Sequence, residues 1–62
     1  MSGQQLVSLL CLQQQGGQDV TLPVLPGERY PGKAQGVYDG REVYAYRVAR
    51  GQGWVRFQLE VL

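Results

Sequence analysis

Apolar and β-branched residues alternate with polar ones through most of the segment 35–62, which indicates extended strands rather than a helix. Asp39 and Gly40 interrupt the first two runs, and an Asp-Gly pair between such runs is a strong hairpin signal. Gly51 and Gly53 mark a second interruption at residues 50–53. The pattern therefore predicts a three-stranded antiparallel meander over residues 35–62.

Tight turns fix the expected register of this meander. A two-residue turn at 51–52 places Val48 opposite Val55, whereas a three-residue loop would pair Arg47 with Phe57 and break the apolar pattern. We therefore expect two-residue turns at 39–40 and at 51–52. One face of the sheet then collects Val37, Tyr44, Tyr46, Val48, Val55, Phe57, Leu59 and Val61.

The apolar run 6–12 fits either a strand or a helix. Leucine and glutamine favour helices, and Ser2 with Gln5 three residues later matches a helix-capping box. A hairpin turn at Gly16 and Gly17 would instead align an apolar face of this run with an apolar face of the next strand. We predict the strand on this register argument. The aligned residues would be Val7, Leu9 and Cys11 on one strand and Val20, Leu22 and Val24 on the other.

These elements give five short strands joined by tight turns. They predict one domain, residues 1–62, of the all-β class: a five-stranded antiparallel meander closing into a small barrel, because closure removes exposed sheet edges. Pro23 is expected at an edge or a bulge, because proline has no N–H to donate to a neighbouring strand. The segment 27–33 is the one substantial loop.

The chain lacks the disulfides and histidine metal sites that often stabilise very small domains. A domain of this size buries only roughly 60% of the surface that its unfolded chain exposes. Cys11 is the only cysteine and there is no histidine, so neither an internal disulfide nor a histidine metal site is available. We therefore expect a homo-oligomer or a small subunit of a larger assembly, with no metal and no cofactor.

The same composition argues against catalysis. No histidine can activate Cys11 or Ser8 as a nucleophile, and the five carboxylates are scattered along the chain. We therefore expect no enzymatic activity.

Charge and hydropathy set the expected surroundings. Six basic residues nearly balance five acidic ones, which weakens a role as a general nucleic-acid or membrane binder. The apolar run 6–12 is far too short to span a bilayer and follows no basic segment, so we expect no membrane insertion. One unpaired cysteine without a signal peptide predicts an intracellular, cytoplasmic protein.

Candidate binding residues lie on the more polar face of the predicted meander and in the loop before it. In the expected register Arg47 faces Arg56, with Trp54 nearby, and facing like charges are stabilised by solvent, a carboxylate or an anionic partner. The loop 27–33 adds further basic and aromatic side chains. The candidate partner-binding residues are Arg29, Tyr30, Lys33, Arg47, Trp54 and Arg56.

Two runs of this chain resemble known small barrels. Residues 24–37, VLPGERYPGKAQGV, are similar to the glycine-punctuated loop and strand of SH3-like barrels of the KOW kind. Residues 53–59, GWVRFQL, are similar to the closing strand of small SH3-like subunits of photosynthetic NADH-dehydrogenase-like complexes. The resemblance covers residues 24–62 and implies a binding module rather than an enzyme.

Two functions follow from these observations. The first is a non-enzymatic interaction module or subunit, docking on a protein partner or a second copy through an apolar hairpin face and an Arg/Trp sheet face. The alternative is a nucleic-acid-binding SH3-like or OB-like barrel, with arginines for phosphates and Trp54 for base stacking. The small net charge of +1 favours the first.

Overall fold

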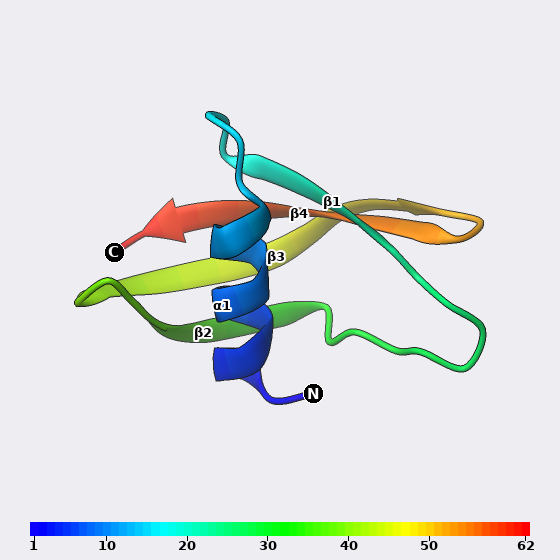
Figure 1. The fold of residues 1–62 in the computed structure, drawn as a ribbon, viewed down its shortest axis with the longest axis horizontal. Coiled ribbons are helices and arrows are strands. Elements are labelled where there is room, and N and C mark those ends of the chain that lie inside the picture. Colours follow the sequence, from blue (N-terminus) through cyan, green and yellow to red (C-terminus); the bar gives the residue numbers. More distant parts are fainter.

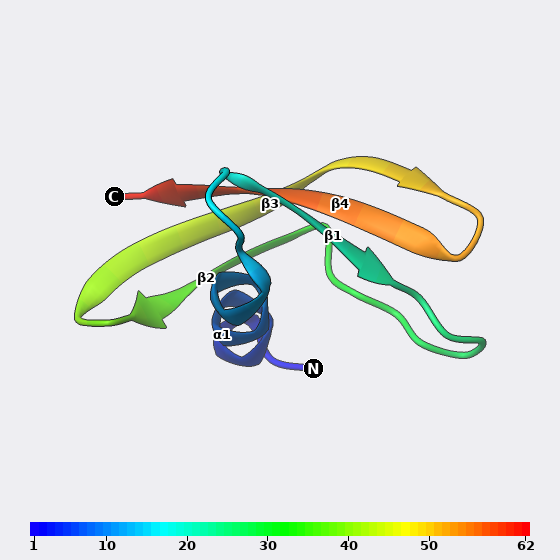
Figure 2. The same cartoon turned by 45° about the horizontal axis from the view of Figure 1, so that its top comes forward.

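A computed structural model describes all residues 1–62 as one sheet covered on one side by one helix. The helix α1 spans Gly3–Gln13, and the strands are β1 (Asp19–Pro23), β2 (Lys33–Tyr38), β3 (Arg41–Gly51) and β4 (Trp54–Val61). The four antiparallel strands lie in the order β1-β4-β3-β2, and α1 crosses them on one face (Figure 1, Figure 2). The expectation of a mainly antiparallel β fold is confirmed in this coarser form.

The prediction of a strand over residues 6–12 is wrong, because this run forms most of α1. A capping box begins the helix: the Ser2 hydroxyl accepts from the Gln5 N–H at 3.1 Å, and the Ser2 N–H donates to the Gln5 side chain at 2.9 Å. Leu6, Val7 and Leu10 then fall on one side of the helix and are fully buried. Gly16 and Gly17 consequently lie in the connection to β1 rather than in a hairpin turn.

The sheet is open, so the predicted five-stranded barrel is not what the chain forms. With the first run in a helix, four strands remain, and β1 and β2 lie at the two edges. Instead of adding a strand, the run 6–12 covers the apolar face of the sheet as part of α1. Pro23 ends β1 at an edge of the sheet, which confirms the expectation for this proline.

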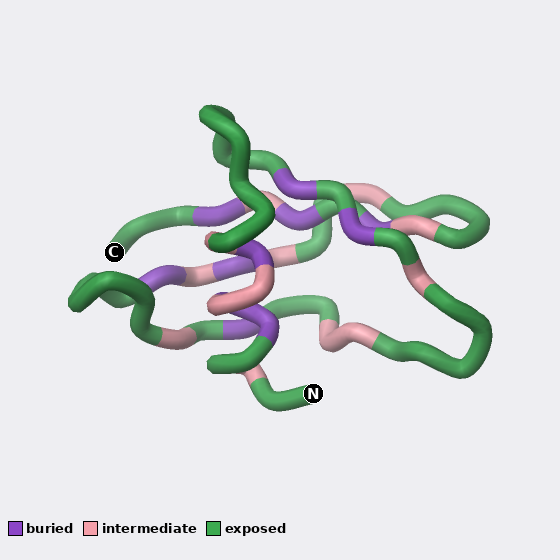
Figure 3. The backbone as a smooth tube through the Cα atoms, in the orientation of Figure 1, coloured by how far each residue is buried: buried purple, intermediate pink, exposed green.

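The hydrophobic core lies between α1 and the sheet (Figure 3). Phe57 on β4, one of the two inner strands, is fully buried and is the largest side chain of this core. Small residues lie on the same face of β2 and β3, where Ala34 and Ala45 are also buried. The buried residues are Leu6, Val7, Leu10, Val20, Leu22, Ala34, Val43, Ala45, Val55, Phe57 and Leu59.

The β2–β3 hairpin has the predicted register, with Tyr38 opposite Arg41 and Gln35 opposite Tyr44. Its turn is formed by Asp39 and Gly40, at φ 54° and 75° respectively. Two successive positive φ values are the backbone that a tight hairpin turn requires, and an Asp-Gly pair adopts them readily.

The β3–β4 register differs from the prediction. The turn residues are Gln52 and Gly53, Gly51 lies opposite Trp54, and the pairing shifts between Arg47 and Ala49, so that Val48 is an extra residue in β3. This β-bulge changes which side chains share a face.

The bulge overturns the predicted apolar face. Tyr44 and Tyr46 lie opposite Glu60 and Gln58, on the face away from α1, whereas Ala45 lies opposite Leu59 beneath the helix. The physical reason is space, because a helix can pack closely on alanine and glycine but not on two tyrosines.

A polar contact joins the beginning of α1 to the edge of the sheet. The Gln4 side-chain amide donates to the Val37 carbonyl at 2.7 Å and accepts from the Val37 N–H at 2.8 Å. Gly36 permits this approach, because a Cβ there would lie 3.2 Å from the Gln4 Cα. We call this pair of hydrogen bonds the Gln4–Val37 clip.

Candidate functional site

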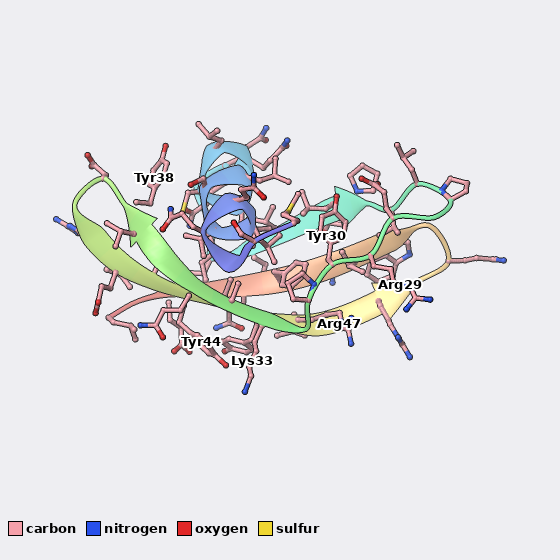
Figure 4. All side chains as sticks on the ribbon, turned by 90° about the horizontal axis from the view of Figure 1, so that it is seen from below. Arg29, Tyr30, Lys33, Tyr38, Tyr44 and Arg47 are labelled. Carbon is pink, nitrogen blue, oxygen red and sulfur yellow. The ribbon has the colours of Figure 1, made fainter.

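The six candidate residues are divided between two sides of the sheet. Arg29, Tyr30 and Arg47 line a cleft beside the loop that joins β1 to β2. Lys33 and Arg56 lie on the sheet face opposite α1, and Trp54 borders both regions. Figure 4 shows Lys33 and Tyr44 projecting away from the helix. The predicted single Arg/Trp face is therefore two surfaces that meet at Trp54.

The first surface is the sheet face without a helix, which we call the uncovered face. Its central row runs across all four strands through directly paired residues: Lys33, Tyr46, Gln58 and Asp19. A positive charge thus lies at the β2 edge and a negative charge at the β1 edge.

Aromatic side chains on the uncovered face are held by their neighbours. The Tyr44 and Tyr46 rings stack with centroids 5.6 Å apart. The Tyr46 hydroxyl donates to the Glu60 carboxylate at 3.1 Å. Partial burial and this carboxylate raise the pKa of Tyr46 above its ordinary value of 10.0.

Trp54 and Arg56 form a second ordered group on this face. The Arg56 guanidinium carbon lies 5.4 Å from the centroid of the Trp54 ring, and its Nε donates to the Thr21 hydroxyl at 3.1 Å. The Trp54 ring covers Gly51, because a Cβ at Gly51 would overlap it. The predicted pairing of Arg47 with Arg56 is wrong, since Ala49 lies opposite Arg56.

The second surface is a cleft of about 420 Å³ between the β1–β2 connection and the β3–β4 hairpin, which we call the arginine cleft. Three arginines line it: Arg29 from the connection, and Arg47 and Arg50 from β3. Tyr30 is half-buried at its inner wall, where its ring meets that of Phe57 edge-on with centroids 6.4 Å apart.

The connection beside the arginine cleft is fixed at both ends to the β3–β4 hairpin. The Val24 N–H donates to the Gly53 carbonyl at 2.9 Å, and the Arg47 N–H donates to the Gly32 carbonyl at 2.8 Å. Between these anchors residues 25–28 form a tight turn, in which the Glu28 N–H donates to the Leu25 carbonyl at 2.9 Å.

The only carboxylate that lines the arginine cleft is held by this turn. The Glu28 side chain accepts a hydrogen bond from the Leu25 N–H at 2.8 Å. One oxygen of the Glu28 carboxylate is therefore hydrogen-bonded to the backbone and not to an arginine.

The bulge at Val48 explains the presence of two arginines from β3. Residues three apart on a regular strand point to opposite faces. Arg47 and Arg50 nevertheless share a face, because they lie opposite Phe57 and Val55, two core residues of β4. Sequence reasoning missed Arg50 for this reason, since the predicted register places Arg47 and Arg50 on opposite faces of the sheet.

A second groove, of about 480 Å³, lies between the end of α1 and the β2–β3 hairpin. Cys11 and Tyr38 line it, with Val43, Leu59 and Val61 on the sheet side. Burial raises the pKa of the Cys11 thiol above its ordinary value of 9.0, which leaves less thiolate at neutral pH.

The helix α1 falls well short of the length that would carry it across a lipid bilayer, and the chain has no other helix. The resemblance to SH3-like barrels stays a prediction. Comparisons with protein-family models, with curated proteins and with solved structures find no match to this chain.

Proposed function

We propose that this chain is a non-enzymatic interaction module that associates with a second copy of itself through the uncovered face. The observation that carries the proposal is the asymmetry of the sheet. One face is covered by α1, whereas the other presents Tyr44, Tyr46 and Trp54 without a covering element. Ordered aromatic side chains are typical of protein interfaces, because they bury much surface at a small cost in conformational entropy.

The charges of the central row favour a second copy of the chain as the partner that binds the uncovered face. A two-fold axis parallel to the strands would exchange β1 with β2 and lay the row of one copy over the row of the other. Lys33 of each copy would then meet Asp19 of its partner. The uncovered face is thus complementary to itself.

The size of the face suits such a dimer. A standard interface buries about 800 Å² per partner. The chain exposes 4324 Å², so a dimer would cover about a fifth of the surface. One face of a two-layer domain supplies an area of this order.

Charge reversal tests the proposal. We expect Lys33→Asp and Asp19→Lys each to weaken the dimer about tenfold, because each converts two attractions across the interface into repulsions. The double variant restores the attraction with the signs exchanged and is expected to regain most of the affinity. Sedimentation over a wide concentration range measures the dissociation constants, with circular dichroism as the test of folding.

Arg41→Asp is the matched control. Arg41 is exposed on the helix side of the sheet, and its replacement changes the net charge by the same amount as Lys33→Asp. It should leave the dimer unchanged. A chain that stays monomeric at all concentrations contradicts the proposal, and so does a double variant that is weaker than both single variants.

The alternative of nucleic-acid binding has less support on this face. Three carboxylates, from Asp19, Glu42 and Glu60, lie on it with only two cations, Lys33 and Arg56. Phosphate backbones are bound by an excess of cations. Sharp, salt-dependent retention on heparin that disappears in a Lys33→Gln and Arg56→Gln variant would favour this alternative instead.

A further inference from the structure

We propose that the arginine cleft is a binding site for a phosphate monoester group. The cleft lies beside the loop on the helix side of the sheet and meets the uncovered face at Gly51 and Trp54. Its three arginines lie outside that face, so the proposal does not rest on self-association. Its volume of about 420 Å³ falls within the range of small-ligand sites, about 300–1,000 Å³.

The local charge supports an anionic ligand. Arg29, Arg47 and Arg50 contribute three positive charges and Glu28 one negative charge, which gives +3 − 1 = +2 at the cleft. The whole chain carries +1, so the residues outside the cleft sum to −1. Positive charge is therefore concentrated at this one site, where it attracts anions over several ångströms.

A phosphate monoester fits this arrangement better than a carboxylate does. It carries a charge of about −1.5 to −2 at neutral pH and has three acceptor oxygens. Each oxygen can accept from a different guanidinium, and the charge offsets the local excess. A carboxylate brings a single charge and fits one guanidinium fork, leaving the other arginines unpaired.

The backbone that carries the three arginines is fixed before a ligand arrives. Hydrogen bonds from Val24 to Gly53 and from Arg47 to Gly32 hold the loop against the hairpin, and Tyr30 packs on Phe57 beneath it. The bulge at Val48 then holds Arg47 and Arg50 on the same side. Such preorganisation lowers the entropic cost of binding.

Titration of the full chain with inorganic phosphate, followed by ¹⁵N amide chemical shifts, tests the site. We expect saturable shifts at Arg29, Tyr30 and residues 47–50, and a response to acetate at equal ionic strength that is at least tenfold weaker. Arg50→Gln should weaken phosphate binding about tenfold or more. Arg50→Lys keeps the positive charge but loses the two parallel N–H donors of the guanidinium group. Its phosphate affinity should lie between those of the unaltered chain and of Arg50→Gln.

Arg41→Gln is the matched control, since Arg41 neither lines the cleft nor contacts a residue of its lining in the β2–β3 hairpin. This variant should bind phosphate as the unaltered chain does. The proposal is overturned if acetate binds as well as phosphate, if the control variant loses as much affinity as Arg50→Gln, or if no saturable shift appears. Because Arg50 is exposed, its variants should stay folded, which the amide spectrum itself reports.

Two further ligands distinguish the source of the phosphate group. Free phosphoserine represents a small phosphorylated molecule, and a short peptide with one phosphoserine represents a modified protein. A peptide that binds at least tenfold more tightly than phosphoserine assigns the site to phosphorylated proteins, and equal affinities assign it to small molecules. The unphosphorylated peptide must show no binding, or the proposal fails.

Discussion

Replacement of Gly36 by alanine tests how α1 sits on the sheet. A Cβ at this position would lie 2.7 Å from Gln4 Oε1, 3.1 Å from its Cδ and 3.2 Å from its Cα. The first two atoms belong to a side chain that can move, but moving it breaks the Gln4–Val37 clip. The third belongs to the helix backbone, so the beginning of α1 must shift as well.

The magnitude follows from two opposing effects. Overpacking costs about 1–3 kcal/mol, and replacing glycine within a strand returns about 0.5–1 kcal/mol of conformational entropy. We expect a net loss of about 1–2 kcal/mol from a total of roughly 3–9 kcal/mol for a domain of this length. The melting temperature should fall by about 5–15 °C.

Urea and thermal denaturation measure this loss, with Gly17→Ala as the matched control. No atom lies within 4 Å of a Cβ at Gly17, so alanine there should leave stability unchanged or raise it slightly. In a Gln4→Ala background the cost of Gly36→Ala should shrink without vanishing, because the new methyl group still presses on the helix backbone. A Gly36→Ala variant as stable as the Gly17→Ala control would refute this account of the packing.

Three further outcomes are expected. Ser2→Ala removes the cap of α1 and should cost about 1 kcal/mol in urea denaturation, with a loss of helical circular dichroism; an unchanged midpoint would mean that the cap contributes nothing. Tyr46 should ionise at higher pH than a free tyrosine in an ultraviolet titration, and Glu60→Gln should lower its pKa. The folded state binds the Tyr46 proton more tightly than the unfolded state does, so the raised pKa stabilises the folded chain below about pH 10. This contribution to the free energy of unfolding is lost as the pH rises through the raised pKa of Tyr46 in the folded chain. Cys11 should react with iodoacetamide more slowly in the folded chain than in urea, since burial raises its thiol pKa, and equal rates would show that the thiol is open.

The sequence predicts best where structure is decided by neighbouring residues. The β2–β3 hairpin follows from Asp39 and Gly40, whose backbone preferences act within the turn itself. The run 6–12 is mispredicted when a register match with the next strand is weighed above a local capping box. The cap satisfies backbone groups of the first helical turn whatever the rest of the chain does.

The bulge is the feature that sequence reasoning could not place. One unpaired residue, Val48, reverses the faces of Arg47 and of the tyrosines relative to β4, and alternation along a strand gives no warning of it. The arginine cleft was therefore predicted only in part. Arg29, Tyr30, Arg47 and Trp54 were among the candidates and do line it, whereas Arg50 was missed.

The Gln4–Val37 clip bears on how far this protein can assemble. An edge strand has unpaired N–H and C=O groups that can hydrogen-bond to a strand of another copy, and repeated addition of strands leads to fibres. At the β2 edge the clip already occupies the Val37 N–H and carbonyl, and at the β1 edge Pro23 offers no N–H. Growth strand by strand is thus hindered at both ends of the sheet. Each copy has one uncovered face, so association through that face closes after two copies and yields a finite particle rather than a polymer.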